Sequence, residues 1–286
     1  MGTVEGAEAQ AEPTAEPTAA HGGRGLVGRL LIVFAVLVVA GAGVWFIGKA
    51  TAPDAGPTTT EIPAMQVAAA PVRPGSVVPA KSAPDPQGGA TPQAGPNSLV
   101  AWSKSVSTAT GVPARALLAY GNAELVLRSA QPGCHLSWAT LAGIGRIESN
   151  HGQYGGAVLG ADGRPSKPII GVPLDGSAGV RAIADTDGGV YDGDRTTDRA
   201  VGPMQFIPST WRTWASDGNG DHSGDPQQID DAALAAARYL CANGRDMGTP
   251  SGWWAGVFSY NNSVPYGQKV FGLADTYAKG AAAARS

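Results

Sequence analysis

The chain has 286 residues, of which 15% are charged and 43% hydrophobic, with a formal net charge of −3. This balance argues against a nucleic-acid-binding protein, which usually carries a basic patch. Two cysteines exclude a disulfide-rich scaffold and a Cys₄ zinc site. Gly and Pro number 41 and 22, so low-complexity segments are expected in part of the chain.

The first hundred residues form three segments that differ in composition. Residues 1–24 hold four acids and no aromatic residue, and they are predicted to be a disordered cytoplasmic tail. Residues 25–49 contain the uncharged run Leu30–Gly48, which is long enough to cross a bilayer and predicts a transmembrane signal-anchor. A cleaved signal peptide is the alternative. The proline-rich residues 50–97 are predicted to be a Pro/Ala-rich linker.

Residues 98–286 hold most of the aromatic residues and both cysteines, and helical signals dominate them. Residues that cap helices, and prolines that suit a first helical turn, recur at intervals that fit short helices. Helices are therefore expected to begin near Ser98, Pro113, Ser137, Ser209, Asp230 or Asp231, Pro250 and Val270.

Helix signals vanish between His151 and Val201, where Gly and Asp are abundant. The runs PIIGVPL and GVRAI fit short strands or extended loops. A loop of this length inside a compact domain is uncommon and usually functional. The sequence therefore predicts a mainly α domain with an irregular, short-stranded insertion.

Glu148 is the strongest candidate for a catalytic residue. Trp138, Leu141, Gly145 and Glu148 share one face of a predicted helix, so the carboxyl points where apolar residues point. Burial and the negative end of the helix dipole both disfavour its ionisation, which suits proton donation. The alternative is a surface glutamate at a helix end, paired with Arg146.

Two further segments have the composition of a sugar-binding groove. They are Gly202–Trp211, GPMQFIPSTW, and Phe258–Ser263, FSYNNS. Flat aromatic faces beside neutral amides and phenols suit pyranose rings and N-acetyl groups. The candidate substrate-binding residues are Met204, Gln205, Phe206, Tyr260 and Asn261. Core packing is the alternative for the aromatic residues, and at least two core residues are expected among Trp211, Trp214, Trp253 and Trp254.

Three segments together resemble the lytic transglycosylases: ESNHG (148–152), GPMQFIPSTW (202–211) and SYNNS (259–263). The pattern is most similar to the membrane-bound transglycosylase B-like branch in its actinobacterial form, over about residues 98–275. The resemblance implies a lysozyme-like (goose-type/transglycosylase) helical fold. It also implies cleavage of peptidoglycan between N-acetylmuramic acid and N-acetylglucosamine.

The family's chemistry needs one glutamate, which acts first as acid and then as base, and Glu148 matches it. The muramoyl 6-hydroxyl takes the place of water and closes a 1,6-anhydro ring, so no second carboxylate and no cofactor for catalysis are expected. Gln205, Tyr260 and Asn261 match positions that hold the sugar, and Ser149 follows the glutamate as in the family. The implied partners are peptidoglycan glycan strands and, through one helix, the membrane.

Two alternatives stay open at this point. A lysozyme-type hydrolase would need a second carboxylate. The insertion offers Asp185, Asp187, Asp192, Asp194 and Asp198. A non-catalytic, membrane-tethered glycan-binding module would need no such pair.

The segment DGNGDHSGD (217–225) is similar to a calcium loop, with oxygen ligands at alternate positions. It departs from the EF-hand pattern at His222, where Gly is usual, and at Gln228, where Glu is usual. The resemblance implies a last carboxylate from the next helix, Asp231 or otherwise Asp230. The candidate ligands of a structural Ca²⁺ are then Asp217, Asn219, Asp221, Ser223 and Asp231. The alternative is an Asx turn whose acid caps the helix.

The domain is expected outside the membrane, in the cell envelope, on a single-pass anchor. Because that compartment is oxidising, Cys134 and Cys241 are predicted to form a disulfide. Two buried thiols are the alternative. His135 and His151 lack metal-ligand spacing and are interpreted as structural.

Overall fold

A computed structural model describes residues 67–76, 96–177 and 179–283. The predicted tail and the predicted transmembrane segment at 25–49 lie outside these ranges. Within them, no helix combines the length and the apolar character that a membrane crossing requires.

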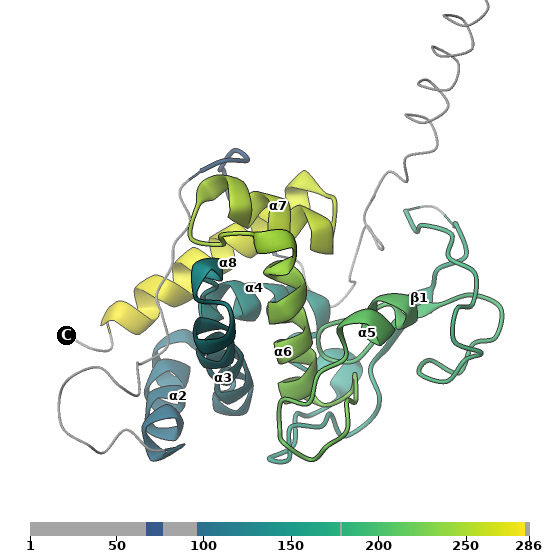
Figure 1. The fold of residues 1–286 in the computed structure, drawn as a ribbon, viewed down its shortest axis with the longest axis horizontal. Helices are drawn as coiled ribbons and strands as arrows, with labels where there is room; N and C mark the ends of the chain where they lie inside the picture. The colour runs from purple at the N-terminus through teal and green to yellow at the C-terminus, as the bar shows by residue number, and fades with distance from the viewer. Residues whose placement is uncertain (1–66, 77–95, 178, 284–286) are drawn as a thin grey trace, which may run out of the picture. The chain divides into compact units, whose positions relative to one another are not determined.

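The described residues form a mainly helical domain, which confirms the predicted fold class and is consistent with a lysozyme-like transglycosylase fold (Figure 1). Short 3₁₀ turns lie at Pro132–Cys134 (η1), Tyr154–Gly156 (η2) and Ala242–Gly244 (η3). The helices are α2 (Pro96–Thr110), α3 (Ala114–Ala130), α4 (Trp138–Ser149), α5 (Pro208–Trp214), α6 (Ile229–Leu240), α7 (Pro250–Tyr260) and α8 (Val264–Ala283).

Helix α4 is the centre of the domain and packs against α3, α6 and α8 (Figure 1). Every residue of α4 except Arg146 is buried, as expected for a helix that is apolar on all sides. Ser137 caps its start as predicted, because its Oγ accepts a hydrogen bond from Ala139 N at 3.2 Å. Gly145 allows α3 to come close, since a Cβ there would lie 2.0 Å from Tyr120 Oη.

Two predicted helix caps and one predicted helix start are wrong. α5 begins at Pro208, not after a Ser209 cap, because proline suits the first turn. Gln228 caps α6 in place of Asp230 or Asp231, and its side chain accepts from Asp230 N. The last helix begins at Val264, six residues before the predicted Val270.

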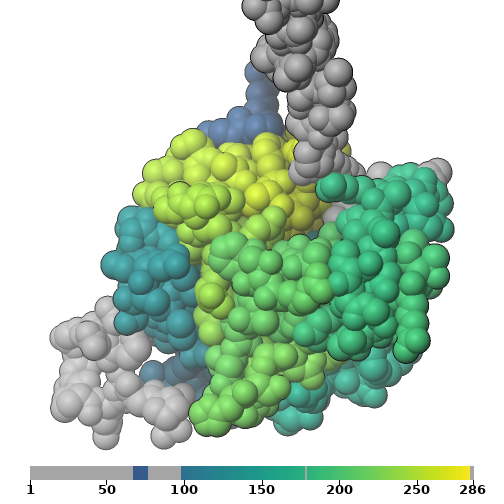
Figure 2. All heavy atoms as spheres, turned by 45° about the vertical axis from the view of Figure 1, so that its right-hand side comes forward, coloured from purple at the N-terminus to yellow at the C-terminus, as the bar shows by residue number. Residues whose placement is uncertain are grey.

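The insertion between α4 and α5 is irregular and short-stranded, as predicted. Its strands β1 (Ile170–Pro173) and β2 (Arg199–Val201) pair antiparallel, with Ile170 opposite Val201 and Pro173 opposite Arg199. Figure 2 shows the surface of the insertion, in teal and green, adjoining that of the green segment that carries α5 and α6. The insertion is therefore packed on the helical domain.

Residues 67–76 belong to the segment predicted as a linker, yet they contact α7 and α8. Ala70 N donates to Gln268 O at 3.4 Å, and Gln268 Nε2 donates to Val72 O at 2.5 Å. Trp254 Nε1 donates to Ser76 O at 3.4 Å, and Val72 packs against the core. We call residues 67–76 the N-terminal strap.

Of the four tryptophans for which core packing was the alternative, three are core residues. The exposed fractions of Trp211, Trp253 and Trp254 are 0%, 0% and 3%. Trp214 is partly exposed at the end of α5.

Candidate active site

The three segments that suggested a sugar-binding enzyme meet at one cleft of about 190 Å³. The end of α4, the loop before α5, α6, the end of α7 and the insertion all contribute to it. The lining residues with roles below are Glu148, Arg181, Gln205, Phe206, Tyr239, Tyr260 and Asn261.

Glu148 lies in the last turn of α4 and is 9% exposed. Tyr266, from the first turn of α8, donates a hydrogen bond to Glu148 Oε1 at 2.5 Å. Burial raises the pKa of Glu148 to about 7, and the bond from Tyr266 partly opposes that rise. The group is therefore substantially protonated at neutral pH. Arg146 instead donates to Asn150 Oδ1, which argues against the surface ion pair.

The loop 202–205 faces the end of α4. Val201 and Phe206 exchange backbone hydrogen bonds of 2.8 and 3.0 Å, which closes a tight loop between them. Only glycine fits at 202, because its φ is +78° and a Cβ would lie 1.7 Å from Pro226 O. Gln205 has φ +49°, and its Nε2 donates to Gly202 O at 3.0 Å. A strained loop thus places Gln205 in the cleft lining, with its amide nitrogen bonded to the loop itself.

Two side chains fix this loop beside Glu148. Ser149 Oγ donates to Pro203 O at 2.6 Å and accepts from Gly152 N at 2.7 Å. Tyr260 Oη donates to Met204 O at 2.6 Å. The side chains of Ser149 and Met204 are fully buried and do not line the cleft. Of the predicted substrate-binding residues, Ser149 and Met204 are therefore placed to support the loop.

The other predicted residues lie in the cleft wall. The rings of Phe206 and Tyr260 are 6.0 Å apart, and those of Tyr260 and Tyr239 are 5.7 Å apart. Asn261 is buried, and its Oδ1 has no hydrogen-bond partner among the described residues. A buried acceptor at a cleft wall costs free energy until a ligand donates to it. The wall therefore holds aromatic rings and one buried, unpaired amide oxygen.

The sequence reasoning missed Tyr239, Tyr266 and Arg181. Tyr266 follows Pro265, and proline suits a first helical turn. Pro265 was therefore the available signal that α8 starts here. Tyr239 lies in an alanine-rich helix whose pattern predicted only core packing. Arg181 reaches the cleft from the insertion, and no local pattern marks it.

The five insertion acids do not line the cleft, where Glu148 is the one carboxylate among the described residues. The carboxylate oxygens of Asp185, Asp187 and Asp198 lie within 4.8 Å of one another. They accept hydrogen bonds from nearby backbone amides and from Thr186 Oγ1. The other two, Asp192 and Asp194, both bond Arg199.

In the candidate calcium loop, Asp217 accepts from the backbone amides of Gly220, Asp221 and His222. Asp231 reaches back from α6 and accepts from Gly218 N and Asp225 N at 2.7 and 3.0 Å. Burial raises the pKa of Asp231. The side chains of Asn219, Asp221 and Ser223 add further oxygen atoms to the same loop. Oxygen ligands of this kind suit Ca²⁺, but the bonds from the loop amides are those of the alternative, an Asx turn.

Asp230, the second choice for that loop, forms an ion pair with Arg115 of α3. It is therefore turned toward α3, while Asp231 turns toward the loop.

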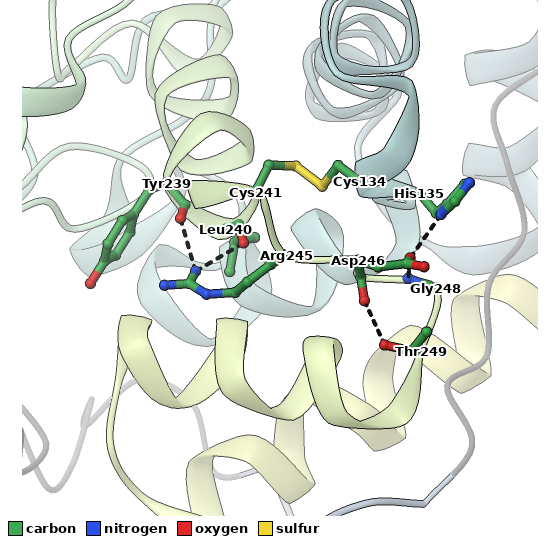
Figure 3. The surroundings of a disulfide bond; sticks show 9 residues. All are labelled: Cys134, His135, Tyr239, Leu240, Cys241, Arg245, Asp246, Gly248 and Thr249. Carbon is green, nitrogen blue, oxygen red and sulfur yellow. Dashed lines mark hydrogen bonds and ion pairs between the residues drawn. A yellow bond between two sulfur atoms is a disulfide. The ribbon is translucent and has the colours of Figure 1, made fainter. Parts of the chain in front are cut away.

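Cys134 of η1 and Cys241 at the end of α6 form a disulfide with a Cα–Cα distance of 5.5 Å, as predicted (Figure 3). The two histidines lie outside the cleft lining. His135 pairs with Asp246 at 2.7 Å. His151 is buried with its Nδ1 3.2 Å from Tyr120 Oη, and burial, with Arg146 nearby, lowers its pKa to about 3.

The chain was compared with protein families, curated proteins and solved structures. The family model of the Transglycosylase SLT domain matches residues 197–257, which include the 202–205 loop, α5, α6 and most of α7. No curated protein and no solved structure matches the chain. The match supports a lytic transglycosylase family with peptidoglycan as substrate. The Glu148 helix lies outside the matched segment and joins it at the cleft.

Proposed function

We propose that this chain is a peptidoglycan lytic transglycosylase with Glu148 as its single acid and base. It cleaves the β-1,4 bond between N-acetylmuramic acid and N-acetylglucosamine and leaves 1,6-anhydro ends. The observation that carries the proposal is that Glu148, with a pKa of about 7, is the one carboxylate lining the cleft among the described residues. Similarity to the transglycosylase B-like branch in its actinobacterial form is part of the proposal.

The proposed reaction uses one carboxyl group, which first donates a proton and later accepts one. Tyr266 holds Oε1, which leaves Oε2 to protonate the glycosidic oxygen. The C1–O bond breaks, its electron pair goes to that oxygen, and the 2-acetamido group supports the positive charge at C1. The Glu148 carboxylate then removes the proton of the muramoyl 6-hydroxyl, whose oxygen bonds to C1.

The cleft wall supplies the sugar contacts. Phe206, Tyr239 and Tyr260 offer ring faces, while Gln205 and Asn261 offer amides for hydroxyl and N-acetyl groups. A hydrolase would need a second carboxylate near the sugar, and the insertion acids bond their own loops.

Digestion of purified peptidoglycan by the full-length protein tests the proposal, with products read by mass spectrometry. Products lighter by one water than reducing-end fragments are expected, and Glu148→Gln should abolish them. Asp275→Asn, at a half-buried carboxylate paired with Lys279 on α8, is the matched control and should retain activity. Reducing-end products would mean a hydrolase, and cleavage-free binding would mean a glycan-binding module.

We also propose that the domain works outside the membrane, held by the predicted segment 25–49. The disulfide supports this placement, because disulfides persist in oxidising compartments. A structural Ca²⁺ in the 217–225 loop belongs to the same proposal, with no part in the chemistry. Protease accessibility of the domain in intact cells tests the placement.

A further inference from the structure

A second hollow, of about 420 Å³, lies beside the disulfide. Its walls come from η1, the end of α5, and the end of α6 with the turn that follows. We call it the disulfide hollow and define it by Gln131, Cys134, Trp214, Arg238, Cys241 and Arg245. The proposed mechanism uses none of these residues.

The disulfide hollow has a positive lining. Arg238 and Arg245 are its charged residues, and no carboxylate lines it. Within the described part of the chain, neither arginine forms an ion pair. Asp246 follows Arg245 in sequence but bonds His135 and Gly248 on the opposite side, as Figure 3 shows.

Each arginine uses its Nη1 atom to bond groups at the end of a helix. Arg245 Nη1 donates to Tyr239 O and Leu240 O at 3.1 and 2.9 Å. Arg238 Nη1 donates to Trp214 O, Ala215 O and Ser216 Oγ at 3.3, 3.1 and 2.7 Å. Helix capping explains where the guanidinium groups lie, but it leaves Nε and Nη2 of each without an acceptor in the described residues. Such an edge binds a carboxylate in a bidentate manner.

Aromatic rings connect the disulfide hollow to the cleft. Trp214, in the hollow, lies 5.6 Å from Tyr239, and Tyr239 lines the cleft 5.7 Å from Tyr260. A peptidoglycan strand combines neutral sugars with peptide stems that carry carboxylates. The aromatic cleft suits the sugars, and the positive hollow suits the stems.

We propose that the disulfide hollow binds the carboxylates of the peptide stem while the glycan strand lies in the cleft. This inference rests on the proposed function for its ligand.

Direct binding tests it without catalysis. Full-length Glu148→Gln protein is titrated by calorimetry with the stem peptide L-Ala–γ-D-Glu–diaminopimelate and, separately, with inorganic phosphate. Gln131 is exposed, and it caps α3 and η1 through its backbone alone. Adding Gln131→Glu therefore places a carboxylate in the hollow without removing a side-chain cap, and should weaken peptide binding by about fivefold or more. Arg238→Gln with Arg245→Gln should do the same, whereas Arg212→Gln, an exposed arginine on α5, should not.

The kinetics of strand cleavage provide a second test. With otherwise wild-type protein, Gln131→Glu should raise the KM for peptide-bearing strands by about fivefold and leave it unchanged for strands stripped of peptides. Equal effects on both substrates, absence of peptide binding, or binding of phosphate alone would overturn the proposal. If the wild-type protein cleaves no strand but still binds the peptide through Arg238 and Arg245, the proposed function fails and the peptide site stands.

Discussion

Among the described residues, Glu148 receives one hydrogen bond, from Tyr266, and that bond influences how its activity responds to pH. The bond stabilises the ionised carboxyl, so it holds the pKa below the value that burial alone would give. Because the first step needs the protonated acid, the rate should fall as pH rises through about 7.

Tyr266→Phe should raise the pKa of Glu148 further and move the alkaline limb of the kcat profile upward by about one pH unit at most. The measurement is kcat against pH on peptidoglycan strands. Tyr154→Phe, a tyrosine of η2 away from the cleft lining, is the control and should leave the limb in place. A lower kcat with an unmoved limb would mean that Tyr266 only supports the fold.

The same carboxyl links stability to pH. Its folded pKa, about 7, lies above the ordinary value of 4.5, so the folded state binds more protons between these values. Stability therefore falls as pH rises from about 4.5 to 7. Glu148→Gln removes this effect and should stabilise the protein above pH 7 by on the order of 2 kcal/mol, with little change below pH 4. Urea unfolding at pH 4 and pH 8 measures it, and a pH-independent difference would contradict it.

Among the elements, η1 and the end of α6 are joined covalently. The disulfide connects η1, just before α4, to the end of α6 across 107 residues. Replacing Cys134 and Cys241 by alanine should lower the free energy of unfolding by about 4 kcal/mol, because the unfolded chain regains the closed loop's freedom. Urea unfolding measures the loss. Thiol titration of the unreduced, unfolded wild-type protein is the check, since two reactive thiols would show that the bond is absent in solution.

The loop before α6 is the second element with a testable role. Ca²⁺ at saturation should raise the Tm of the full-length protein by about 5 °C, because binding to the folded state alone stabilises it. Asp231→Asn should abolish the shift, whereas Asp230→Asn should keep it, since Asp230 pairs with Arg115. An equal Tm with calcium and with chelator would remove the metal from the proposal.

Element types were predictable here where sequence periodicity was strong, and element ends were not. α4 has a Ser137 cap and an apolar surface, and both could be read directly. α6 starts after a Gln228 cap, while Asp230, one of the predicted caps, pairs with Arg115, a contact across 115 residues that no local pattern contains. Pro265 indicated the start of α8, and the prediction did not use it.

At the level of the whole molecule, the cleft could be predicted as a set of motifs but not as a geometry. Glu148, Gln205 and Tyr260 were named from residue types and their order, and they line one cleft. Ser149 and Met204 were also named, yet their side chains are fully buried and lie outside the cleft lining. Whether a motif residue faces ligand or core depends on packing between α4, the loop and α7, which spacing along the chain does not encode.

The N-terminal strap shows the same limit, because its composition is that of a spacer. Its Val72 packs against the core, and its backbone bonds Gln268 and Trp254. A protein that begins at residue 67 should therefore be more stable than one that begins at residue 77 by about 1–2 kcal/mol, the effect of covering one valine and its neighbours.

Chemical unfolding of the two truncated proteins measures this difference. Val72→Asp in the longer protein should reduce its stability to that of the shorter one, whereas Arg73→Asp, at an exposed neighbour, should not. Equal stability of the two truncated proteins would mean that the strap does not hold to α7 and α8 in solution. The predicted linker would then extend as far as α2.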